Sequence, residues 1–171
     1  MVGFRARLWR MTKRFPFPNP ANETSARLVA GGVVLISAAF LITNSTVILL
    51  ALTYGFAARV VAGPAFSPLA LIVTRIITPK LNFNHKFVPG PPKRFAQTIG
   101  LTFAATALIL SSLDYSLAAK LVIAALIFAA TLESVFAICL GCIMFSFLMK
   151  RGVIPQSVCE SCNDISLRVL A

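Results

Sequence analysis

The stretch LAAKLVIAALIFAATLESVFAICLGCIMFSFLM, residues 117–149, contains only two charged side chains, Lys120 and Glu133. Such a long, nearly uncharged apolar run is typical of a helix in a lipid bilayer rather than of a water-soluble core. As one continuous α-helix it would rise about 50 Å, whereas the hydrocarbon core of a bilayer is about 30 Å thick. The run must therefore tilt, break or project from the membrane, and we expect Gly141 to be where its direction changes.

Three further apolar runs precede this stretch, and short polar turns at residues 44–46 and at Asp114 join the four runs in pairs. The pattern predicts an all-α membrane protein with four transmembrane helices arranged as two hairpins. The expected spans are residues 28–43, 47–62, 95–113 and 117–140, the last extending as far as residue 149.

The segments outside these runs define the domain boundaries. Residues 68–77 predict a short helix that starts at Pro68 and stops before Pro79; because it would rise only about 15 Å, we expect it to be re-entrant or interfacial. Residues 22–152 form the expected membrane domain. Residues 1–21 are a basic lead, either an interfacial helix or an unstructured basic tail, and residues 153–171 are a cysteine-containing cytoplasmic tail.

The charges predict how the chain is oriented. The net charge is +11, with 58% hydrophobic and only 12% charged residues, whereas soluble domains carry about 25% charge. The basic residues flank the apolar runs, which argues against nucleic acid as a partner. With both termini in the cytoplasm, Lys120 is the only one of the 16 Lys and Arg residues that falls on the outer side. The positive-inside rule therefore favours cytoplasmic N- and C-termini.

The four cysteines form two C-x-x-C pairs, Cys139 with Cys142 and Cys159 with Cys162. The spacing C-x2-C-x16-C-x2-C fits a four-thiolate zinc site, so we expect zinc as the metal if these residues are metal ligands. The same pairs also fit dithiol redox chemistry. In a reducing cytoplasm a permanent disulfide is rare, so we do not expect one here.

The two pairs are expected to differ in reactivity. Cys139 and Cys142 fall in the C-terminal part of the long apolar run, where a helix dipole disfavours a thiolate. Pro155 could instead begin a short helix that places Cys159 near its N-terminus, where a thiolate is favoured. The sequence therefore predicts that Cys159 is the more nucleophilic thiol.

Glu133 is a carboxylate inside an apolar run, where an unpaired charge is costly. We expect it to form a structural ion pair with Arg59 or Arg75, and a proton-transfer role or a neutral, hydrogen-bonded acid are the alternatives. On an ideal helix it points about 120° away from Cys139, which argues against acid–base help to that thiol. His85 is expected to be a solvated loop residue.

Several segments carry a family resemblance: SPLA at residues 67–70, PKRFAQ at residues 92–97, and the stretch from Leu132 to the CLGC motif. With them, the chain resembles the DUF4395 family, small bacterial integral membrane proteins of unassigned function. The tail from residue 153 to residue 162 is similar to that of some members. The resemblance implies four spans in a bacterial inner membrane and adds Arg94, in its most specific block, to the candidate site residues. It also implies thioredoxin-like or rhodanese-like sulfurtransferase partners.

Three functions fit these observations. The first is a membrane scaffold or accessory subunit that uses a cytoplasmic four-cysteine cluster, with or without zinc, to dock a soluble partner or a larger membrane complex. The second is a thiol or sulfur relay that passes equivalents from a soluble partner through Cys159 and Cys162 to Cys139 and Cys142. The third is a transporter of a small sulfur species. Whether the chain is an enzyme is left open by the sequence.

Overall fold

The computed structural model describes residues 21–80, 87–155 and 158–159, and helices dominate them. The four long helices are α2 (Glu23–Thr43), α3 (Thr46–Ala62), α6 (Gly90–Ser112) and α7 (Ser116–Phe136). The shorter elements are β1 (Ala21–Asn22), η1 (Gly63–Phe66), α4 (Pro68–Ile72), the π-helical η2 (Val73–Ile77), α5 (Thr78–Lys80), β2 (Phe87–Val88) and α8 (Leu140–Lys150).

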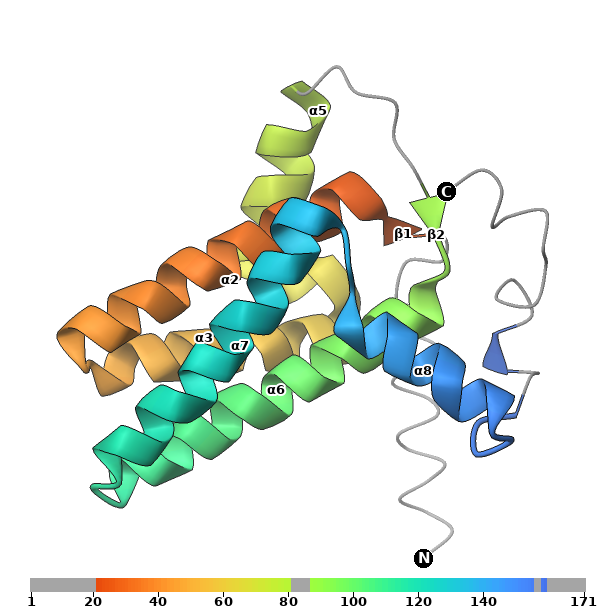
Figure 1. Ribbon diagram of the computed structural model, residues 1–171. Helices are drawn as coiled ribbons and strands as arrows, with labels where there is room; N and C mark the ends of the chain where they lie inside the picture. Colours follow the sequence, from red (N-terminus) through yellow and green to blue (C-terminus); the bar gives the residue numbers. More distant parts are fainter. Residues whose placement is uncertain (1–20, 81–86, 156–157, 160–171) are drawn as a thin grey trace, which may run out of the picture.

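Four helical stretches are long and apolar enough to cross a membrane: α2, the stretch from Thr46 to Lys80 that begins with α3, α6 and α7. The chain is a multi-pass membrane protein, and the predicted fold class is confirmed. The four long helices lie side by side as a bundle, with α2 against α7 and α3 against α6 (Figure 1). Its core is filled by apolar side chains from all four helices: Val33, Phe40, Leu49, Leu52, Phe56, Ala104, Ala107, Ala119, Ile123, Leu126 and Ala130.

The two predicted hairpin turns are present. Asn44 ends α2 with a φ of 53°, and Asp114 separates α6 from α7 with a φ of 63°. Asn and Asp adopt this left-handed conformation more readily than other non-glycine residues, which explains why the chain reverses at these positions.

Two long helices start earlier than the apolar runs suggested. Helix α2 begins at Glu23, where Asn22 caps it by accepting a hydrogen bond from the Ser25 N–H at 3.3 Å. Helix α6 begins at Gly90 because prolines are tolerated in a first turn, where their missing N–H groups would have no helical partner. Strands β1 and β2 pair antiparallel just before these two helices, a feature the sequence did not predict.

The predicted short helix is present but does not stop at Ile77. After α4 the chain forms the wider π-turn of η2 and continues through α5 to Lys80. The Thr78 N–H donates to the Val73 carbonyl within this wide turn. Single π-turns of this kind occur within α-helices and can kink them, and here the turn lies directly before Pro79.

The long run of residues 117–149 is broken at residues 137–139, not at Gly141. Ala137 has a φ of 58°, and the N–H groups of Ala137 and Ile138 both donate to the Leu132 carbonyl, which ends α7. Arg27 donates from Nε and Nη2 to the carbonyls of Ser134 and Val135 at 3.1 and 3.0 Å, so two acceptors at this helix end are satisfied by a side chain.

Helix α8 then leaves α7 at an angle and crosses α6 (Figure 1). Gly141 lies at this crossing: a Cβ there would be 2.6 Å from the Ala96 Cα, so only glycine permits the approach. Gly141 is therefore a packing residue and not the point where the chain changes direction.

Candidate functional site

The Cys139-Leu140-Gly141-Cys142 motif forms the beginning of α8. Cys139 is the N-cap residue, with extended backbone angles, and Cys142 lies in the first helical turn. The prediction that this pair occupies the C-terminal part of a helix is wrong, because α7 ends before it. At a helix N-terminus the partial positive charge of the backbone N–H groups favours a thiolate.

The two sulfurs interact directly. Both cysteines are free, and the Cys142 thiol donates a hydrogen bond to the Cys139 Sγ at 2.6 Å. This hydrogen bond lowers the pKa of Cys139, against the opposing effects of burial and of Glu133, and the Lys93 ammonium lowers it further. The same hydrogen bond, together with burial, raises the pKa of Cys142. Cys139 is thus the member of the pair that becomes a thiolate first.

An ion pair lies beside the cysteines. The Lys93 Nζ contacts the Glu133 carboxylate at 2.7 Å, and the two side chains are only 9% and 16% exposed. Glu133 therefore has a structural partner, as expected, but the partner is Lys93 and not Arg59 or Arg75. The early start of α6 explains the difference, because it places Lys93 in the first turn of α6, next to the last turns of α7.

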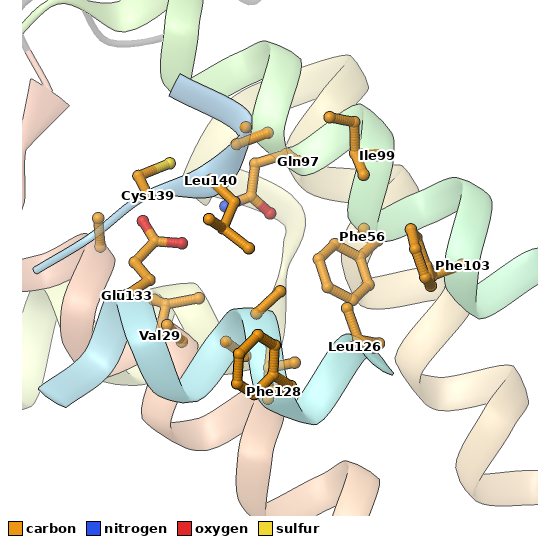
Figure 2. A pocket seen from close by; sticks show the side chains of 18 of the residues that line it. Val29, Phe56, Gln97, Ile99, Phe103, Leu126, Phe128, Glu133, Cys139 and Leu140 are labelled. Carbon is orange, nitrogen blue, oxygen red and sulfur yellow. The ribbon is translucent and has the colours of Figure 1, made fainter. Parts of the chain in front are cut away.

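Glu133 and Cys139 also line a common cavity of about 280 Å³ within the bundle. Figure 2 shows the Cys139 sulfur and the Glu133 carboxylate close together at one end, and the rings of Phe56, Phe103 and Phe128 towards the other. The expectation that these two side chains diverge is wrong, because it assumed an unbroken helix. The cavity could hold an apolar group next to the Cys139 sulfur.

The other predicted site residues lie elsewhere or outside the described residues. Arg94 donates from Nε to the Val60 carbonyl at 3.0 Å and so ties α6 to α3. Cys159 is 3% exposed and packs with Phe145 and Met149 of α8. The basic lead up to residue 20, His85, Cys162 and the remaining tail from residue 160 lie outside the described residues.

Cys159 is disulfide-bonded in the structure, although a permanent disulfide was not expected in a reducing compartment. Across residues 21–80, 87–155 and 158–159, no three Cys, His, Asp or Glu side chains gather closely enough to hold a metal ion. The structure thus does not bring Cys159 to the Cys139–Cys142 pair. A four-cysteine zinc site, which needs Cys162 as well, stays a prediction.

Sequence reasoning missed Lys93 as a site residue. The signal was present, because a lone carboxylate in an apolar run needs a cation at the same depth. Lys93 lies just before the expected span, which starts only at residue 95. Gln97, which also lines the cavity, lies near the start of that span.

Comparison with known proteins gives one match. The family described as "Domain of unknown function (DUF4395)" matches residues 21–150 of the chain. No curated protein and no solved structure matches it.

Proposed function

The chain belongs to the DUF4395 family, whose function is unknown, and we propose that it is a membrane-bound dithiol–disulfide exchange protein. The reacting groups are Cys139 and Cys142. One observation carries the proposal: Cys139 occupies the N-cap position of α8 and accepts a hydrogen bond from Cys142 three residues later. This arrangement gives one thiol that attacks and a second that resolves the intermediate.

The exchange requires a partner protein that carries a reducible disulfide. The Cys139 thiolate attacks one partner sulfur, which forms a mixed disulfide and releases the other partner sulfur as a thiolate. Cys142 then loses its proton, attacks the Cys139 sulfur and breaks the mixed disulfide. The result is a Cys139–Cys142 disulfide and a partner dithiol, so two electrons have moved to the partner. The released partner thiolates take up the Cys142 proton and one further proton from water.

The orientation favours a cytoplasmic partner. We place both termini on the cytoplasmic side of a bacterial inner membrane. Supporting this, Arg27, Arg59, Lys93 and Arg94 all make contacts at the bundle end where α2 and α6 begin and α3 and α7 end. The cysteine pair lies at the same end. A soluble thioredoxin-like or sulfurtransferase protein is the class of partner that this location allows.

The surface next to the pair supports docking of such a partner. Cys139 itself is only 8% exposed, but Phe136, Ile138 and Leu140 around it are 64%, 43% and 42% exposed. Exposed apolar side chains of this kind mark contact with lipid or with another protein. A partner that covers them would also exclude water from the reacting sulfurs.

Mixed-disulfide trapping tests the proposal. The Cys142→Ser variant lacks the resolving thiol, so it should accumulate a stable covalent adduct with an oxidised thioredoxin-like protein, detected by nonreducing electrophoresis. The matched Cys139→Ser variant should form no adduct at that motif. Equal adduct formation by both variants, or by neither, would refute the assignment.

The same preparation separates this proposal from a zinc scaffold. A scaffold would bind about one zinc per chain through thiolates and would show no change in free thiols after contact with the oxidised partner. An exchange protein should lose two thiols per chain on such contact, in keeping with the two-electron reaction of one cysteine pair.

A further inference from the structure

Among the described residues, buried Arg59 has no carboxylate within ion-pair distance. Its side chain is 5% exposed; its Nε donates to the Gln97 Oε1 at 2.8 Å and its Nη1 to the Ser67 Oγ at 3.4 Å. The remaining nitrogen, Nη2, has no hydrogen-bond partner in the part of the chain that the structure describes. A buried charge is costly unless it is paired and fully hydrogen-bonded.

The neighbouring charges do not balance Arg59. Glu133 is the nearby carboxylate, and it is already bonded to Lys93 at 2.7 Å. Within the described residues, two buried cations, Arg59 and Lys93, share the Glu133 carboxylate, which leaves an excess positive charge around them. An anion from outside the described residues would compensate it.

A cavity lies against these cations. It has a volume of about 340 Å³, is lined by Arg59, Lys93 and Gln97, and extends to residues of β1 and β2 at the end of the bundle. It differs from the apolar cavity beside Cys139 because polar side chains of α2 and α5 contribute to its wall.

The wall of this cavity offers hydrogen-bond donors. The hydroxyls of Ser25 and Thr78 lie 3.0 Å apart and share one hydrogen bond, which leaves one of their two protons to donate. Asn22 uses its carbonyl oxygen to cap α2, which leaves its amide N–H groups as donors. Helix α2 begins here, so the positive end of its dipole is at the same place.

We propose that this cavity binds a tetrahedral oxyanion of the phosphate or sulfate type, with Arg59 as the anchoring cation. A guanidinium with an unused nitrogen suits such an ion, since the Nη2 N–H groups remain available as charge-assisted donors to an oxyanion. The cavity is larger than the bare ion and has room for an ester substituent. The oxyanion can therefore be a free ion or the headgroup phosphate of an anionic lipid. This inference does not depend on the cysteine chemistry.

The test uses the full chain in a nonionic detergent. Thermal unfolding and calorimetric titration are measured with sodium phosphate, sodium sulfate and, as the ionic-strength control, sodium chloride. We expect phosphate or sulfate to stabilise the chain, and Arg59→Gln to bind about tenfold more weakly or worse. Arg94→Gln is the matched control, since Arg94 bonds a backbone carbonyl and does not line the cavity; it should bind normally.

A second arm identifies the source of the oxyanion. Native mass spectrometry after reconstitution in phosphatidylglycerol vesicles should show a retained phospholipid on the wild type and not on Arg59→Gln if the headgroup binds. Stabilisation by inorganic phosphate or sulfate without retained lipid indicates a free ion. Either result supports an oxyanion site.

The proposal is overturned if the wild type retains no phospholipid and is stabilised no more by phosphate or sulfate than Arg59→Gln is. It is also overturned if Arg94→Gln loses binding as strongly. Should Arg59→Gln fail to fold, the double variant Ser25→Ala/Thr78→Val removes both hydroxyls, and with them the free donor, from the wall with little change in shape. That variant should bind the anion severalfold more weakly, and unchanged binding would contradict the proposal.

Discussion

At the scale of single residues, the surroundings of Cys139 and Cys142 give two chemically identical thiols different pKa values. Cys139, at the N-cap position of α8, accepts the hydrogen bond, whereas Cys142 donates it. The acceptor is stabilised as a thiolate and the donor is held as a thiol, so the hydrogen bond by itself divides the roles of nucleophile and resolving group. Cys159, which the sequence favoured as the nucleophile, is buried and disulfide-bonded.

The pH dependence of alkylation follows from these directions. Because the pKa of Cys139 is lowered and that of Cys142 is raised, Cys139 should react first as the pH rises. Its inflection should lie below that of an ordinary cysteine thiol. Iodoacetamide labelling read by peptide mass spectrometry measures this. In Cys142→Ala the hydrogen bond is absent, so the Cys139 inflection should move to higher pH; an unchanged profile would contradict the account.

At the scale of elements, the site depends on where helices begin and end. The cysteine pair is at a helix N-terminus only because α7 ends at Phe136, and Lys93 reaches Glu133 only because α6 begins at Gly90. The crossing of α8 over α6 at Gly141 then holds the pair close to that ion pair. A substitution at the crossing should therefore change the burial and reactivity of the cysteines although neither cysteine is itself replaced.

Substitution of Gly141 tests this crossing. In Gly141→Val the new Cβ meets the Ala96 backbone, so α8 must move away from α6, at a cost of about 1–3 kcal/mol. Thermal unfolding in detergent should show a lower midpoint, and Cys139 should label faster in the folded state as its burial decreases. Ile143→Val, at a 57% exposed position of the same helix, is the control and should change neither quantity.

At the scale of the whole molecule, the two hairpins pack across each other, with α2 on α7 and α3 on α6. This arrangement gathers the buried basic side chains Arg59 and Lys93, the cysteine pair and the polar-lined cavity at one end of the bundle. The other end carries the two tight turns and Lys120. The charge asymmetry predicts that the end with the cysteines faces the cytoplasm.

Cysteine labelling of intact cells tests the orientation. In a chain whose native cysteines are replaced by serine, Ser116→Cys and Lys150→Cys each place one thiol at an exposed position at opposite ends. A membrane-impermeant maleimide should label Ser116→Cys in intact cells and Lys150→Cys only after permeabilisation. The reverse pattern would overturn the proposed topology.

The sequence by itself determined the membrane class, the number of spans and both hairpin turns. These features depend on local composition. An apolar run long enough to cross a bilayer has few structural alternatives to a transmembrane helix. Asn44 and Asp114 adopt the left-handed turn conformation without needing contacts from distant parts of the chain. Glu133, as a lone carboxylate in an apolar run, likewise indicated that it needs a cationic partner.

Only the tertiary structure decided which residues meet. The break at Ala137 lies in an apolar segment without glycine or proline, and it is stabilised by contacts from α2, such as Arg27 at the end of α7. Because of that break, the cysteine pair lies at the start of α8 and not near the end of α7. The break also allows Glu133 and Cys139 to line one cavity. Such contacts join residues that are 40 to 108 positions apart, and no local pattern encodes them.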